Sequence, residues 1–145
     1  MNLSKDVKIS QVLGYSAAGV VAKTSAVIDM QGFAGAVFVA TLGVVTLGSA
    51  IALKAQEDIV SSMANVKDLS GAAAAFIAGA SDSNKCLIVD VYRPKERFLR
   101  AVLTPATQNA EILSIVAIQY QAGCKPTQID PTVAATALAV SPNEI

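Results

Sequence analysis

The chain has 145 residues, of which 53% are apolar and 15% are charged, and its eleven basic and eleven acidic residues cancel. This length predicts a single domain with a substantial core, and this composition excludes a largely disordered chain. The zero net charge argues against a general basic field for nucleic acid or anionic membrane, and the absence of histidine removes the commonest general base and metal ligand.

In chain order, residues 1–24 are expected to form an N-terminal arm. Residues 7–12 alternate in polarity, which predicts one strand within it. The first six residues are mostly polar and no apolar signal segment follows, so we expect a reducing compartment. Cys86 and Cys124 have the spacing of neither a disulfide framework nor a zinc site. We therefore expect no metal and no cofactor.

Residues 25–56 are rich in valine, isoleucine, threonine and alanine, which favours strands. Three strands are predicted, over residues 25–30, 36–42 and 50–56. We expect Gly43 to end the second strand, with a short connection before the third.

The same region allows an alternative, because no charged residue occurs from Gly32 to Leu53. Twenty-two uncharged residues are enough for a membrane-spanning helix, which needs about 20. Gly43 and Gly48 lie where turns between strands would be needed, and valine and threonine outnumber leucine. The pattern therefore favours β-structure and no membrane contact, and the small membrane protein remains the weaker alternative.

Residues 57–69 are the most polar interior stretch and predict a long loop or one helical turn. Residues 72–80 are rich in alanine, but the run is short and lies between turn signals, so we expect a strand. Residues 81–84 form a cluster of turn residues before the next strand.

Residues 86–104 predict two strands joined by a turn at residues 93–96. Pro94 suits the second position of a type I turn, so we expect a hairpin with a loop of about four residues. In that register Tyr92 lies opposite Arg97, Val91 opposite Phe98 and Val89 opposite Arg100. Asp90 is then expected to pair diagonally with Arg97, and Arg93 with Glu96 across the turn.

Basic side chains gather at this predicted hairpin: Lys85, Arg93, Lys95, Arg97 and Arg100. One interpretation is an ordinary solvated hairpin tip. The other is a docking tip, because tyrosine and arginine are enriched at binding hot spots. The candidate partner contacts are Tyr92, Arg93, Lys95, Arg97 and Arg100. The aromatic residues are not interleaved with the basic ones as in a single-stranded nucleic-acid platform, so nucleic acid is not expected as a partner.

Residues 111–120 predict a long strand, with Ile112, Ser114, Val116, Ile118 and Tyr120 on one face. Residues 122–145 contain Pro126, Pro131 and Pro142 and predict an extended C-terminal tail. The predicted fold class is all-β: a jelly-roll-like sandwich or barrel over residues 25–121, with extended arms at 1–24 and 122–145. No catalytic motif is present, so we do not expect an enzyme.

Several segments occur together in an order that resembles one family. These are residues 29–33 (DMQGF), 37–43 (VFVATLG), 53–56 (LKAQ), 82–85 (DSNK), 87–94 (LIVDVYRP), 97–100 (RFLR) and 118–120 (IQY). As a set, over roughly residues 26–121, they resemble the head decoration, or cement, proteins of tailed bacteriophages. The chain differs in its alanine-rich residues 72–80 and in its proline-containing tail.

The resemblance implies a structural virion protein on the outer surface of the capsid, assembled in the host cytoplasm, with no catalytic residues. Its implied partners are the major capsid protein of the same phage and further copies of itself, with a homodimer favoured over a homotrimer. Strands that are apolar on both faces agree with this, because they need a second cover outside the sandwich. A tail, neck or host-surface-binding virion module is the alternative.

Overall fold

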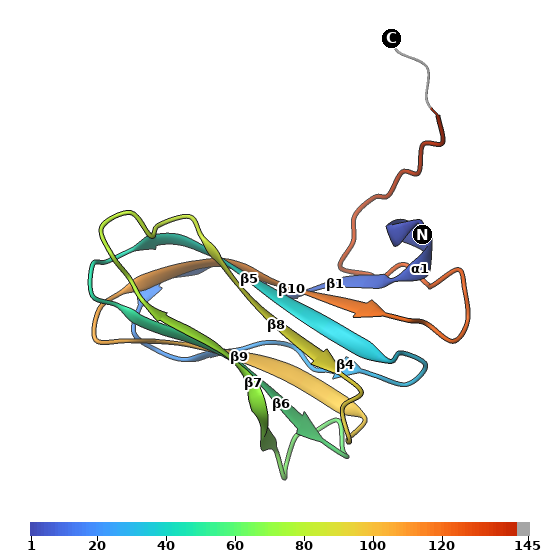
Figure 1. The fold of residues 1–145 in the computed structure, drawn as a ribbon, viewed down its shortest axis with the longest axis horizontal. Helices are drawn as coiled ribbons and strands as arrows, with labels where there is room; N and C mark the ends of the chain where they lie inside the picture. The colour runs from blue at the N-terminus through green and yellow to red at the C-terminus, as the bar shows by residue number, and fades with distance from the viewer. Residues whose placement is uncertain (142–145) are drawn as a thin grey trace.

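The computed structural model describes residues 1–141, which form two antiparallel sheets packed face to face (Figure 1). Sheet A has the order β1-β10-β5-β8, and β2 also pairs with β10. Its strands are β1 (Lys8–Leu13), β2 (Ser16–Gly19), β5 (Gly35–Val45), β8 (Cys86–Tyr92) and β10 (Ala110–Tyr120). Sheet B has the order β3-β9-β6-β7, and β4 also pairs with β9. Its strands are β3 (Lys23–Thr24), β4 (Ile28–Asp29), β6 (Ala50–Asp58), β7 (Lys67–Ile77) and β9 (Phe98–Ala106). The predicted all-β sandwich is confirmed.

The core lies between the sheets, where both contribute alternate apolar side chains. Phe38 and Ile115 of sheet A and Leu53, Leu99 and Leu103 of sheet B are fully buried. Burial of one such large side chain stabilises the fold by roughly 1.5–3 kcal/mol. The period-two alternation of the sequence therefore specifies which face of each strand turns inward.

Strands over residues 36–42, 50–56, 72–80 and 111–120 are present as β5, β6, β7 and β10, with shifted ends. The prediction that Gly43 ends a strand is wrong, because β5 continues to Val45. A Cβ at position 43 would lie 2.7 Å from Oε2 of Glu111 on the neighbouring strand. A side chain at position 43 would therefore require the Glu111 carboxylate to move.

The predicted hairpin of residues 86–104 is wrong. β8 pairs with β5, where Val91 lies opposite Ala36, and β9 pairs with β6, where Leu99 lies opposite Glu57. The connection therefore crosses from sheet A to sheet B. The physical reason is that each strand has its own buried face, and the two faces meet across the core. The hairpin register would have grouped Arg100 with the buried apolar residues of β8.

The predicted single face of residues 112–120 is wrong at Ile112. Ile112 and Ile115 are both buried, although simple alternation places them on opposite faces. The register between β10 and β5 shifts on both sides of Ile112. A bulge of this kind inserts an extra residue and moves the side chains that follow to the other face.

The uncharged segment from Gly32 to Leu53 contributes β5 and the first part of β6, which lie in different sheets. The helix α1 (Leu3–Asp6) has four residues. Within residues 1–141 no helix has the length and apolar character needed to cross a membrane.

Residues 8–24, assigned above to an arm, supply β1, β2 and β3 to the two sheets. The tail from residue 121 to 141 contains no strand; its first part lies beside the N-terminal segment and its last part extends away from the sandwich (Figure 1). Thr127 Oγ1 donates to the Val7 carbonyl at 2.6 Å, and Lys8 pairs with Asp130 at 3.3 Å. Residues 134–141 are exposed. Pro142 and the residues after it lie outside the described residues.

Candidate functional site

The candidate site is the connection between β8 and β9, residues 93–97, which we call the 93–97 arch. Its two ends are fixed by backbone hydrogen bonds. The Arg93 N–H donates to the Ala34 carbonyl at 2.8 Å, and the Met30 N–H donates to the Arg97 carbonyl at 2.9 Å. Arg93 has a φ of 52°, in the left-handed region that non-glycine residues seldom adopt. The connection between β4 and β5, which contains Met30 and Ala34, therefore holds both ends of the arch.

Glu57 fixes the middle of the arch. Its Oε2 accepts from the Lys95 N–H at 3.1 Å and from the Glu96 N–H at 3.2 Å. The residue is only 6% exposed, at the sheet B end of the arch. Hydrogen bonds from backbone N–H groups to a carboxylate are stronger than those between neutral groups. One buried carboxylate thus secures two successive residues of an otherwise exposed connection.

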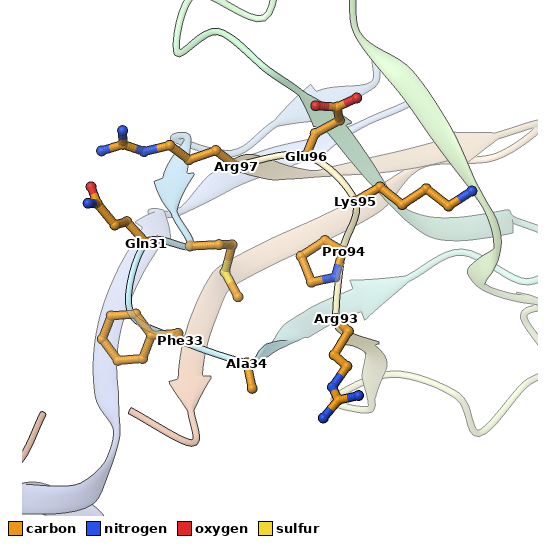
Figure 2. A pocket seen from close by; sticks show the side chains of 9 residues that line it. Gln31, Phe33, Ala34, Arg93, Pro94, Lys95, Glu96 and Arg97 are labelled. Atoms are coloured by element: carbon orange, nitrogen blue, oxygen red, sulfur yellow. The ribbon is translucent and has the colours of Figure 1, made fainter. Parts of the chain in front are cut away.

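The arch and the end of β8 bring four of the five predicted contact residues to one end of the sandwich: Tyr92, Arg93, Lys95 and Arg97. Figure 2 shows the side chains of Arg93, Lys95, Glu96 and Arg97 directed away from one another. The predicted pair of Arg93 with Glu96 is wrong, because within residues 1–141 neither residue forms an ion pair. Arg93 and Lys95 are both exposed. Their charges are available to a partner.

Arg97 pairs with Asp29 of β4, so the predicted pair with Asp90 is wrong. Arg97 Nε and Nη2 donate to the two carboxylate oxygens at 2.8 and 2.6 Å. The Arg97 hydrogen bonds lower the pKa of Asp29, against a smaller opposing effect of burial. The same hydrogen bonds raise the pKa of Arg97. This two-point contact orients the guanidinium at the outer end of the arch.

Tyr92 belongs to an aromatic pair on the outer side of sheet A. Its ring stacks with that of Tyr120, with centroids 6.5 Å apart and planes 5° apart. The Tyr120 hydroxyl donates to Asp90 Oδ1 at 2.7 Å. Burial, followed by this hydrogen bond and the Asp90 charge, raises the pKa of Tyr120 to about 12. The Arg93 guanidinium lies over the Tyr92 ring, with its Cζ 5.2 Å from the ring centroid. At this distance a cation is attracted to the face of an aromatic ring.

Arg100 lies apart from the arch, on the outer face of sheet B. Its Nε donates to Gln56 Oε1 at 2.8 Å, and Gln56 Nε2 donates to Asp68 at 2.6 Å. Lys54 completes the network with a contact of 2.7 Å to Asp68, and the Lys54 and Gln56 hydrogen bonds lower the pKa of that carboxyl. The structure therefore gives Arg100 a cross-strand role that is separate from the other candidates.

Open grooves lie on both sides of the arch. One, of about 640 Å³, is lined by Met30, Gln31, Phe33, Ala34 and the arch (Figure 2). The other, of about 630 Å³, lies between the arch and the start of β7. Within residues 1–141 no cluster of three metal-ligating side chains occurs. The arch and Tyr92, which place exposed basic and aromatic side chains between two grooves, are suited to binding a complementary surface.

Sequence reasoning missed three residues that shape the site: Glu57, Asp29 and Tyr120. The sequence predicts a long loop or one helical turn from Glu57 onward, whereas Glu57 pairs with Leu99 inside sheet B. Asp29 and Tyr120 come from strands distant in sequence, and only the sheet register brings them to the arch.

Comparison with known proteins adds a fold similarity. No protein-family model matches the chain, and no curated protein matches it. Among solved structures, the chain is similar to the PBSX exported protein XepA, with a TM-score of 0.52 and 14% identity over 97% of this chain and 46% of that one. The chain is more weakly similar to dimeric latent PorU from Porphyromonas gingivalis. That similarity has a TM-score of 0.45 and 13% identity, over 84% of this chain and 13% of that one. The chain thus spans about half the length of XepA, and at this identity the likeness concerns the fold.

Proposed function

We propose that this protein is a structural component of a bacteriophage particle that decorates the outer surface of the capsid. In this role it binds adjacent major capsid subunits and performs no catalysis. The observation that carries the proposal is the 93–97 arch, which presents Arg93 and Lys95 to solvent from a fixed backbone, next to the exposed Tyr92 at the end of β8. The family resemblance of residues 26–121 and the fold similarity to a phage PBSX exported protein both support a phage-related role.

The arch suits recognition because its backbone is held before any partner binds. A loop that is already ordered loses little conformational entropy on association, so more of the contact energy becomes affinity. Tyrosine and arginine supply large contact areas and directional hydrogen bonds. Arg93 and Lys95 place two positive charges at the tip and favour an acidic or carbonyl-rich patch on the capsid partner.

Stabilisation of a capsid follows from mass action. A protein that binds only the assembled lattice shifts the equilibrium toward that lattice, by an amount set by its concentration and affinity. Many weak contacts become strong when copies are joined, because each further contact forms at high effective concentration. The exposed residues 134–141 would add a second contact with a neighbouring capsid subunit.

The test is co-sedimentation of the purified protein with phage heads that lack it. The double variant Arg93→Ala/Lys95→Ala removes two positive charges that form no ion pair within residues 1–141. We expect it to lose at least about tenfold in affinity for heads while keeping the wild-type circular dichroism spectrum.

The control is Lys5→Ala/Lys23→Ala, which makes the same change in charge on α1 and β3, outside residues 93–97. It should bind heads like the wild type. Equal binding by both double variants would remove the arch from the proposed mechanism, and no binding by the wild-type protein would reject the capsid role. A tail or neck module is the alternative, and it would sediment with tails.

A further inference from the structure

The outer edge of β8 carries unpaired backbone groups. β8 is the last strand of sheet A and pairs with β5 alone. The Arg93 N–H donates to the Ala34 carbonyl at 2.8 Å, so every second residue before Arg93 also bonds to β5 in this antiparallel ladder. The residues between them direct their N–H and C=O groups to the free edge: Cys86, Ile88, Asp90 and Tyr92. Within residues 1–141 these groups form no backbone hydrogen bond.

The opposite edge of sheet A is covered by the protein's own tail. The Thr127 N–H donates to the Lys5 carbonyl at 2.9 Å, and the Gln11 N–H donates to Thr132 Oγ1 at 2.9 Å. The tail thus occupies hydrogen-bonding groups from α1 to β1. Soluble proteins cover an edge strand in this way because a free edge invites another strand to pair with it.

The edges of sheet B are protected by their shape. β3 and β4 have two residues each, too few for a ladder of their own. β7 is interrupted, because its register against β6 jumps between the pairs Lys54–Ala73 and Gln56–Asp68, and Gly71 lies in the interruption with a φ of 78°. An irregularity of this kind bends a strand and disrupts its pairing.

β8 has none of these protective features. Its seven residues keep one regular register against β5 and include no proline or glycine. Its one charged residue, Asp90, accepts from the Tyr120 hydroxyl of β10 at 2.7 Å, and is therefore held over sheet A and not across the free edge. Ile88 and Tyr92 are 56% and 54% exposed. β8 is the longest regular edge that is left open within residues 1–141.

Space for a further strand lies beside this edge. The groove of about 630 Å³ next to the arch is lined by residues 90–96 on one side and by residues 67–72 on the other. It separates β8 from β7, the two strands that end sheets A and B on this side of the sandwich. Charges of both signs line it, so net charge selects no partner and recognition falls to the backbone. An extended segment laid along β8 would enter the groove and reach the arch.

We propose that the free edge of β8 binds an extended segment of another protein, which adds to sheet A as a further strand. Unpaired N–H and C=O groups that alternate along an edge match another extended backbone, and such strand addition is a common mode of peptide recognition. The added strand lies about 4.8 Å from β8, with alternate side chains beside Ile88 and Tyr92. An uncharged, β-branched segment fits there, because such side chains pack well against aliphatic and aromatic neighbours across strands. The protein's own tail is a poorer match, since four of residues 133–140 are alanine, which is depleted in strands.

The test is a titration of the isotope-labelled full chain with the acetylated and amidated peptide Ser-Thr-Val-Thr-Val-Thr-Ser, followed by NMR. We expect the largest changes at the amide resonances of the four free-edge residues of β8, and little change in β1. Ile88→Pro removes one free-edge N–H and places a ring in the path of the added strand, while the ladder to β5 keeps its hydrogen bonds. It should raise the Kd of the peptide at least about tenfold.

Ile88→Thr is the matched control, because it changes the same side chain but keeps the N–H and suits a strand. It should change the Kd by less than about threefold. A second control is the same peptide methylated on its central backbone nitrogens, which lacks the N–H donors of an added strand. It should not bind.

Unchanged β8 resonances at the highest peptide concentration would overturn the proposal, and so would an unchanged Kd for Ile88→Pro. If Ile88→Pro does not fold, the methylated peptide decides, and binding equal to that of the parent peptide rejects strand addition. A peptide of residues 132–140 that binds more tightly than the probe would overturn the assignment to another protein. The measurement uses no phage particle, and head binding through the arch requires no added strand, so this proposal and the capsid role fail separately.

Discussion

The role of Glu57 in fixing the arch can be tested by removing the Glu57 carboxylate. Glu57→Ala deprives the Lys95 and Glu96 N–H groups of their acceptor. A part-buried donor left without a partner costs about 1–3 kcal/mol, and water reaches the outer side of the arch, so we expect a loss of about 2–4 kcal/mol for the pair. Glu57→Gln retains an acceptor oxygen and loses only the charge, so it should cost about 1 kcal/mol.

The assay is equilibrium unfolding in urea, followed by circular dichroism. For a chain of this size, the loss of unfolding free energy expected for Glu57→Ala would lower Tm in a separate thermal melt by roughly 4–16 °C. The order of stability should be wild type, then Glu57→Gln, then Glu57→Ala. A loss below about 0.5 kcal/mol for Glu57→Ala, or equal losses for both variants, would refute the view that these two hydrogen bonds fix the arch.

Further predictions concern Gly35, Tyr120 and the C-terminal tail. Gly35→Ala should lower the free energy of unfolding in urea by about 1–3 kcal/mol, because a Cβ there would collide with the Tyr120 ring. Gly19→Ala is the control and should cost much less, because the atom nearest to a Cβ at that position is 3.9 Å away. Because the pKa of Tyr120 is raised to about 12, its contribution to stability should be complete below about pH 10 and be lost as the pH rises toward 12. Tyr120→Phe should show a smaller loss in that interval, and an equal loss would contradict the assignment. Limited proteolysis should cut first within residues 134–141 and leave a folded core, and Thr127→Val should extend the cut toward the body by removing the hydroxyl donor to Val7.

The strands could be predicted where period-two alternation is strong. Leu87, Val89 and Val91 alternate with exposed residues in β8 as the sequence indicated. Alternation identifies the faces of a strand but not its neighbour. Leu99, Ala101 and Leu103 of β9 are the matching inner face, and they lie across the core rather than beside β8. A short connection with Pro94 fits a hairpin and an inter-sheet arch equally well, so pairing by proximity in sequence gave the wrong neighbour.

The candidate contact residues could be identified from the residue types at the predicted turn, but their hydrogen-bond partners within the chain could not. Tyr92, Arg93 and Lys95 are exposed at the arch as a docking tip requires. The partner of Arg97 comes from β4, and the acceptor that fixes the arch comes from β6. These contacts depend on the order of strands in two sheets. That order follows from how the whole set of apolar faces is buried, which no single segment of the sequence contains.

Labelling of purified phage particles with an antibody against this chain tests the capsid role most directly. The particles should come from the phage that encodes the chain, and electron microscopy should locate the label. A capsid decoration protein predicts label distributed over the outer surface of the head and absent from particles of a deletion mutant. Label confined to the tail or neck, or intact particles without label, would contradict the capsid role.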